Sequence, residues 1–241
     1  MTINRYTHIF FDLDNTLWDF RANSFAALKI AYSNFKIESQ YPDYQNFFDV
    51  FTEINDLLWS DYRKKLLVKK ELQRLRFSMT FDRLEINGVD PLEMDSFYLS
   101  EIPKQKNLID GASRVLQYLK SKGYLLFIIT YGFKEVQTDK LKNSGLSQYF
   151  TRIYISEDIK APKPGREIFE YAIKSANARK TKSIMVGDDW ESDIEGALNF
   201  GVDAVYFCPS ANRPVPLDCD RIYNRNKVFS INALSGLYDI L

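Results

Sequence analysis

Short apolar runs alternate with stretches of helical periodicity along the chain from residue 111 onward. The longest run, 124–130, is apolar without alternation, which is typical of a parallel strand covered on both faces. Each run is followed by apolar residues at three- and four-residue spacing, which indicates a helix. Repeated strand-helix units of this kind predict a parallel sheet. The expected strands are 124–130, 152–156, 183–187 and 203–207, and the expected helices are 135–144, 165–177, 191–200 and 231–241.

A further apolar run at 7–13 predicts a strand near the N-terminus, but the strand-helix alternation does not resume until Gly111. From 23 to 102 the pattern is helical throughout, with aromatic residues such as Phe47 and Phe51 at helical spacing. A helical segment is therefore inserted after the first strand.

These patterns predict an α/β protein with two domains. Residues 1–20 and 104–241 are expected to form a Rossmann-like core, a parallel sheet with helices on both faces. Residues 21–103 are expected to form the inserted helical domain.

Composition narrows the classes of partner. The 241 residues include 32 basic and 32 acidic side chains, so the chain lacks the basic excess of a protein that binds a nucleic-acid polymer. No apolar run approaches the roughly 20 residues that span a bilayer, so we expect no membrane association and a cytoplasmic location. An uncharged, mixed surface favours a monomer.

The cysteines and the histidine offer little chemistry. Cys208 and Cys219 lack the spacing of a zinc site, and we expect both to be reduced and structural. His8 is the only histidine and falls inside the first predicted strand, where a core role is expected. A mechanism that needs a catalytic histidine would have only this residue to use.

Two carboxylates, Asp12 and Asp14, follow the first predicted strand. The carboxyl end of a parallel sheet is where its ligand crevice opens. Like charges this close are costly unless a proton or a divalent cation offsets them, so the pair suggests a hard metal with oxygen ligands. Taken alone, the same pair is equally well explained as a solvated turn.

Two more elements follow along the chain, one at the end of a predicted strand and one before a predicted helix. Thr130 is followed by Tyr131 and Gly132, and a glycine there allows backbone amides to approach an anion. Lys163 lies between two prolines, which stiffen a loop and can fix its charge for phosphate. Ordinary explanations exist for each: Thr-x-Gly ends many strands, and most such lysines are solvated.

The last element is an acidic cluster at the end of the strand 183–187. Asp188, Asp189 and Asp193 fall within six residues. Helix capping explains one of them but not all three, because the carboxylates would repel one another unless a cation lay among them.

In this order, the four elements resemble the motifs of the haloacid dehalogenase superfamily: aspartate-x-aspartate-x-threonine, a threonine or serine, a lysine, and glycine-aspartate followed by a further acid. The inserted segment is similar to that superfamily's helical cap. Residues 10–23 and 130–164 look most like the bacterial pyrimidine 5′-nucleotidase branch. There the second motif usually reads threonine-asparagine-glycine, whereas this chain has Tyr131 in the middle position.

The resemblance implies a covalent mechanism. Asp12 would attack phosphorus and form an aspartyl-phosphate, and Asp14 would donate and then accept a proton. The phosphoryl oxygens would be bound by Thr130, Tyr131, Gly132 and Lys163.

The resemblance also implies Mg²⁺ as cofactor. Its expected ligands are Asp12, the main-chain carbonyl of Asp14, Asp188, and either Asp193 or Asp189. The expected partner is a small phosphorylated metabolite, with nucleoside 5′-monophosphates first.

Three alternatives stay open. A sugar-phosphate phosphatase or phosphomutase would share every motif. A haloacid dehalogenase would share the nucleophile but has no need for magnesium or for Asp14. A non-catalytic scaffold would have no reason to keep the crowded acids of such a site.

Overall fold

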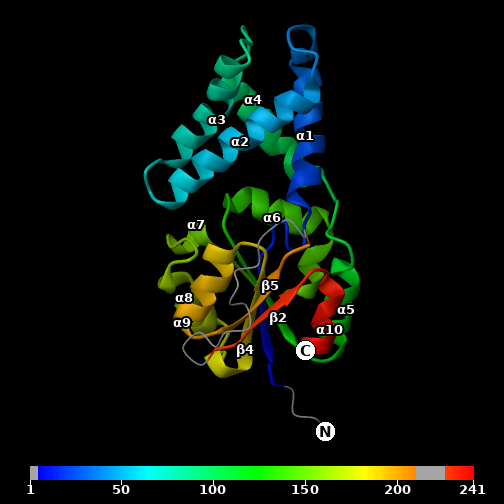
Figure 1. Cartoon of the computed structure of the whole chain (residues 1–241), viewed down its shortest axis with the longest axis vertical. Helices are drawn as coiled ribbons and strands as arrows, with labels where there is room; N and C mark the ends of the chain where they lie inside the picture. The colour runs from blue at the N-terminus through cyan, green and yellow to red at the C-terminus, as the bar shows by residue number, and fades with distance from the viewer. Residues whose placement is uncertain (1–4, 210–225) are drawn as a thin grey trace. The chain divides into compact units, whose positions relative to one another are not determined.

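The computed structural model describes residues 5–209 and 226–241 (Figure 1). Its contacts divide the chain into two compact units, Met1–Phe20 with Lys106–Leu241 and, between them, Arg21–Gln105. The predicted cap role of the second unit stays a prediction. Cys219 lies outside the described residues, whereas Cys208 is buried.

Among the described residues, the first unit is built on a six-stranded sheet in which every pair of neighbours is parallel, with the order β3-β2-β1-β4-β5-β6. The strands are β1 (His8–Phe11), β2 (Leu125–Thr130), β3 (Arg152–Ile155), β4 (Ser183–Gly187), β5 (Asp203–Phe207) and β6 (Val228–Ile231). The order reverses at β1, so the chain leaves β1 and β4 in opposite directions along the sheet. A ligand crevice of a doubly wound fold opens at this point.

Both faces of the sheet are covered. Phe10, Phe127 and Met185 point to one face and pack with Phe169 of α8 (Arg166–Ser175) and Leu198 of α9 (Gly196–Phe200). The alternate strand residues are also buried, and Figure 1 shows α5 (Ala112–Ser121) and α10 (Leu237–Ile240) on the opposite side of the sheet from α8 and α9. The predicted α/β class, with helices on both faces of a parallel sheet, is confirmed.

The α-helices of this unit lie between successive strands of the chain, except α10, which follows β6. They are α5 (Ala112–Ser121), α6 (Lys134–Asn143), α7 (Ser156–Ile159), α8 (Arg166–Ser175), a π-helix (Trp190–Glu195) continued by α9 (Gly196–Phe200), and α10 (Leu237–Ile240).

Two predicted elements differ from the structure. The helix expected at 231–241 is wrong at its start, because Val228–Ile231 instead forms the edge strand β6 and only the last turn is α-helical. The helical pattern covers only the last residues, because Ile231, the first residue of the expected helix, pairs with β5. The helix expected at 191–200 begins as a π-helix, a form that occurs mostly as single turns at functional sites.

The second unit contains four α-helices, α1 (Phe20–Asn34), α2 (Tyr44–Arg63), α3 (Lys69–Arg83) and α4 (Pro91–Glu101). Its core is aromatic: Phe51 and Phe77 are stacked with centroids 5.0 Å apart, and Tyr98 meets both rings edge-on. Asp43 and Asp90 cap α2 and α4 by accepting from main-chain amides in the first turn.

His8 lies at the start of β1 and is partly buried. Its Nδ1 is 2.9 Å from the hydroxyl of Thr7, and its ring stacks on Phe127. Burial lowers the pKa of this imidazole from its ordinary value. Within the part of the chain that the structure describes, no helix is both long and apolar enough to cross a membrane.

Candidate active site

The ends of β1 and β4 bring two acids together. Phe11 is paired with Val186, and the amide of Asp12 continues the ladder by donating to the Val186 carbonyl at 2.9 Å. Asp12 therefore follows β1 at the level of Gly187, the last residue of β4, and Asp188 comes one residue later. This is the switch point of the sheet, where the fold opens its crevice.

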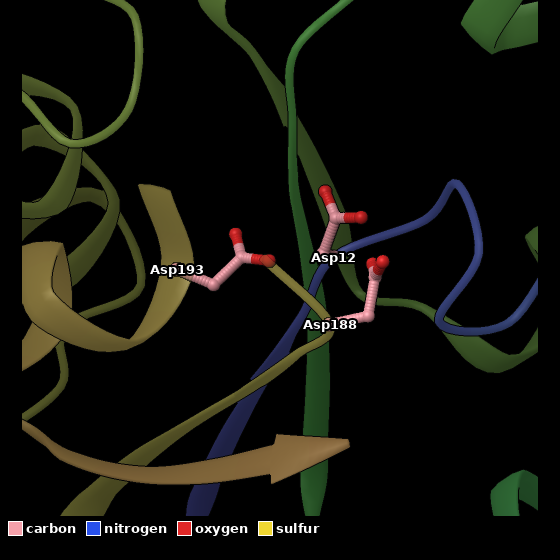
Figure 2. Close-up of side chains that lie close together, drawn as sticks. All are labelled: Asp12, Asp188 and Asp193. Carbon is pink, nitrogen blue, oxygen red and sulfur yellow. The ribbon is translucent and has the colours of Figure 1, made fainter. Parts of the chain in front are cut away.

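A third acid joins them from the π-helix. Asp12, Asp188 and Asp193 each offer a carboxylate oxygen within 4.8 Å of the others. All three residues are buried, and Figure 2 shows Asp193 reaching from its helical turn toward the two strand-end acids. Buried carboxylates are stable only when cations or hydrogen-bond donors offset their charge.

Lys163 supplies one such cation. Its ammonium donates to Asp12 Oδ1 at 2.5 Å and to Asp193 Oδ1 at 2.6 Å, and the residue is 3% exposed. The lysine lies in the loop between α7 and α8, where the Lys163–Pro164 peptide bond is cis. The predicted lysine is therefore an internal partner of two acids and not a solvated surface charge.

Burial decides the protonation of these groups. Burial raises the pKa of Asp12 to about 7, with Asp193 adding to the rise and Lys163 opposing it. Burial likewise raises the pKa of Asp193 to about 6, against the pull of Lys163 and with a further rise from Asp188. Burial alone would lower the pKa of Lys163, but Asp12 and Asp193 outweigh it and raise that pKa. The lysine is charged, and a further cation would favour full ionisation of the acids.

Gly187 makes room for Asp193. A Cβ on Gly187 would lie 2.2 Å from Asp193 Oδ2 and 2.5 Å from its Cβ. Such contacts are far inside van der Waals distance, so only glycine lets the turn bring Asp193 beside the end of β4.

The alternative acid, Asp189, has another role. Its exposed side chain caps the π-helix by accepting from the amide of Ser192 at 2.8 Å. It is not part of the buried cluster, whereas Asp193 is. Of the two acids that the sequence left open, the structure brings Asp193 to the other carboxylates.

The turn after β1 is shaped by Asn15 and Thr16. Asn15 adopts a left-handed conformation with φ of 60°, which asparagine tolerates better than most residues. The buried hydroxyl of Thr16 donates to Asp188 Oδ1 at 3.0 Å. Thr16 therefore orients one acid of the cluster.

Asp14 lies apart from the three clustered carboxylates. Its Oδ1 accepts from Lys140 Nζ at 2.7 Å, and its Oδ2 accepts from Gln137 Nε2 at 2.9 Å. The same Gln137 nitrogen lies 2.6 Å from the hydroxyl of buried Thr130 at the end of β2. Asp14 and Thr130 are thus joined through one side chain. Metal ligation by the Asp14 carbonyl stays a prediction.

Gln137 and Lys140 were not among the predicted site residues. Both are buried on α6, on the same helical face as the apolar residues Val136 and Leu141. Polar residues within the apolar stripe of a helix are the sequence signal that would have found them. Tyr131 and Gly132 follow β2 and are partly buried, as neighbours of Thr130.

The arrangement can hold a hard cation and a phosphoryl group. Three clustered carboxylates provide the oxygen ligands that Mg²⁺ prefers, and a single ammonium offsets only part of their charge. A nucleophilic carboxylate, an acid beside it and fixed positive charge are the parts that displacement at phosphorus requires.

Known proteins are similar to this chain in sequence and in architecture. The sequence model of the haloacid dehalogenase-like hydrolases matches residues 9–207. The chain is 33% identical over 207 residues to the pyrimidine 5′-nucleotidase PynA of Streptococcus pneumoniae, covering 85% of this chain and 84% of PynA. It is 31% identical over 241 residues to a glyceraldehyde 3-phosphate phosphatase of Pyrococcus furiosus, and the match covers 99% of this chain and 94% of that protein. The structure of the HAD-hydrolase YfnB from Bacillus subtilis, bound to magnesium, matches with a TM-score of 0.84 at 26% identity over 99% of each chain.

Proposed function

The chain belongs to the haloacid dehalogenase-like hydrolases, and on that premise we propose that it is a magnesium-dependent phosphatase of nucleoside 5′-monophosphates. The observation that carries the proposal is the buried cluster of Asp12, Asp188 and Asp193 with Lys163 bonded to two of its members. Residues 181 positions apart meet in one charged site at the switch point of the sheet. A packed interior has no structural need for so many charges, since burying them is costly.

In the first half of the reaction, Asp12 is the nucleophile. The oxygen of its carboxylate attacks phosphorus, a bond from Asp12 to phosphorus forms, and the ester bond from phosphorus to the leaving oxygen breaks. Asp14 gives its proton to that oxygen, which departs as a neutral alcohol. Lys163 holds the nucleophile in orientation through Asp12 Oδ1, which leaves Oδ2 as the attacking oxygen.

In the second half, water hydrolyses the aspartyl-phosphate. Asp14, now ionised, accepts a proton from the water as its oxygen bonds to phosphorus. The bond from Asp12 to phosphorus breaks, and inorganic phosphate and the free Asp12 carboxylate are restored. The hydroxyl of Thr130 and the ammonium of Lys163 would donate to the phosphoryl oxygens, where negative charge accumulates.

The residues fit Mg²⁺ by their chemistry. The ligands would be the carboxylates of Asp12, Asp188 and Asp193 with the main-chain carbonyl of Asp14. When bound, the cation supplies positive charge that offsets the acids and the phosphoryl group together. Thr16, bonded to Asp188, orients one of these ligands.

The substrate class rests on relatives. PynA is a pyrimidine 5′-nucleotidase at 33% identity, which favours nucleoside 5′-monophosphates with a pyrimidine base. The glyceraldehyde 3-phosphate phosphatase at 31% identity over 99% of the chain favours a small sugar phosphate as the second candidate. A dehalogenase is disfavoured, because displacement of halide from carbon does not need the acidic cluster or Asp14.

Phosphate release from a panel of esters tests the proposal. The panel contains uridine, cytidine and adenosine 5′-monophosphates and glyceraldehyde 3-phosphate, assayed with Mg²⁺ and with EDTA. We expect turnover with Mg²⁺, none with EDTA, none for Asp12→Asn, and pyrimidine nucleotides as the best substrates. The matched control is Asp189→Asn, which changes a neighbouring exposed acid and should keep its activity. Full activity of Asp12→Asn would refute the nucleophile, and preference for the sugar phosphate would refute the substrate class.

A further inference from the structure

One face of α6 meets the proposed acid Asp14 with two buried polar side chains. Gln137 and Lys140 are three positions apart and therefore neighbours on the helix surface. They are 1% and 3% exposed, and each donates to a different oxygen of the same carboxylate. Asp14 is thus held at both oxygens by a single helix.

The hydrogen bonds of Gln137 fix the direction of its amide. When Asp14 is ionised its carboxylate only accepts, so the group that faces Asp14 Oδ2 is the NH₂ and not the carbonyl. The second hydrogen of that NH₂ is directed to the Thr130 oxygen at 2.6 Å. Thr130 therefore accepts from Gln137, and its own hydroxyl hydrogen is left to be donated to another acceptor.

The ammonium group of Lys140 is a buried charge. Its ammonium lies 4.4 Å from the centroid of the Trp18 ring and 5.2 Å from that of Phe20, and it is bonded to Asp14 Oδ1. Burying an ammonium is costly, and aromatic faces together with a carboxylate offset that cost. The rings confine the ammonium, so the atom bonded to Asp14 has little freedom to move.

Gly132 leaves space for Gln137. A Cβ on Gly132 would lie 2.8 Å from Gln137 Cδ and 2.9 Å from its Cγ. The second motif thus contributes a hydroxyl at Thr130 and, two residues later, the room that lets Gln137 reach that hydroxyl.

We propose that Gln137 and Lys140 are positioning residues that hold the Asp14 carboxyl toward the leaving oxygen, and that Gln137 also couples it to Thr130. The inference rests on the proposed phosphatase function. Each oxygen of Asp14 keeps a second lone pair for the transferred proton while the first accepts from α6. Gln137 is hydrogen-bonded both to Asp14, which transfers the proton, and to Thr130, which binds the phosphoryl oxygens.

The dependence of turnover on the leaving group tests this role. Uridine 5′-monophosphate releases an alkoxide that needs a proton, whereas p-nitrophenyl phosphate releases a stable phenolate that does not. For Lys140→Met and Gln137→Leu we expect kcat/KM with the nucleotide, which reports only the steps up to departure of the leaving group, to fall by about 10²-fold, the lower range for general acid catalysis. With p-nitrophenyl phosphate we expect a much smaller fall. The ratio of the two rates does not depend on the fraction of folded enzyme.

Two further measurements separate the roles of the residues. Inorganic phosphate as a competitive inhibitor should bind more weakly to Gln137→Leu, because Thr130 loses its partner, and unchanged to Lys140→Met. Lys140→Arg, which keeps a cation at this position, should recover part of the nucleotide rate. Lys142→Met is the matched control, since it removes an exposed lysine from the same helix.

The outcomes are distinct. An active wild-type enzyme whose two variants lose kcat/KM equally with both esters, or lose none, overturns the positioning role and leaves the phosphatase proposal intact. A wild-type protein that hydrolyses neither ester overturns the proposed function and this inference with it.

Discussion

The ammonium of Lys163 lies 2.5 Å from a carboxylate oxygen of Asp12, although 151 positions separate the two residues in the chain. The lysine also reaches Asp193, so it is the cation between two buried acids. This relationship defines the electrostatics of the site, because both acids have a raised pKa even with Lys163 beside them.

Removal of the lysine charge should disable the site. We expect Lys163→Met to lower kcat by about 10²-fold or more, as for loss of a preorganised electrostatic partner. Lys163→Arg should retain more activity because it keeps the charge, but less than wild type, since the guanidinium is larger than the buried space of an ammonium. Steady-state kinetics with the best nucleotide measures both. Wild-type turnover in Lys163→Met would contradict the assigned role.

Asp193 and Asp189, the two acids of the last motif, should differ in their effect on Mg²⁺ binding. Asp193→Asn removes a member of the buried cluster, and we expect Mg²⁺ affinity to fall by about 10-fold or more. Asp189→Asn should leave affinity near wild type, because Asp189 is exposed and asparagine is also a good helix cap. Titration calorimetry with Mg²⁺ measures both variants. Equal losses in the two would show that Asp189 is also a ligand.

Stability without metal should fall as pH rises. The folded protein holds protons on Asp12 and Asp193 up to pKa values of about 7 and 6, whereas the unfolded chain loses them near the ordinary value of 3.8. The folded state then binds more protons than the unfolded state between about pH 4 and pH 7, so the free energy of unfolding decreases across that interval. Lys163 stays charged throughout, since its pKa is raised.

Mg²⁺ should reverse this trend, because it binds ionised carboxylates. Thermal unfolding followed at pH 5 and pH 8, with and without Mg²⁺, measures the effect. The stabilisation by Mg²⁺ is expected to be larger at pH 8 and to be reduced in Asp193→Asn. A larger effect of Mg²⁺ at pH 5 would contradict the raised pKa values.

The helical unit should depend on its buried ion pair. Arg76 Nε donates to Asp95 Oδ1 at 2.5 Å, both residues are buried, and burial raises the pKa of Asp95. Arg76→Met leaves that carboxylate without its charge partner and should lower the free energy of unfolding by about 3 kcal/mol or more.

Urea denaturation measures this loss, with Arg83→Met as control. Arg83 pairs with Glu53 on the surface, where such pairs contribute at most about 1 kcal/mol. Adding Asp95→Leu to Arg76→Met should restore part of the stability, because no buried charge is then left. A double variant less stable than Arg76→Met would argue against the uncompensated charge as the cause.

The sequence alone determined the fold class and the positions of the strand-end acids. Unbroken apolar runs are specific for buried parallel strands, and acids directly after them are local features that need no knowledge of packing. Asp12, Thr130 and Asp188 could therefore be assigned to strand ends, and the helical insertion could be recognised by its period.

The tertiary structure decided which distant side chains lie together and which segments pair, because a local sequence pattern does not contain this information. That Asp193 and not Asp189 lies beside Asp12 and Asp188 depended on how the helical turn packs at the end of β4. The edge strand β6 formed because β5 offered it a pairing partner. Gln137 and Lys140 resemble ordinary helix residues until α6 packs beside Asp14 and Trp18. Side chains distant in sequence acquire a joint role only through burial, which makes their charges and hydrogen bonds depend on one another.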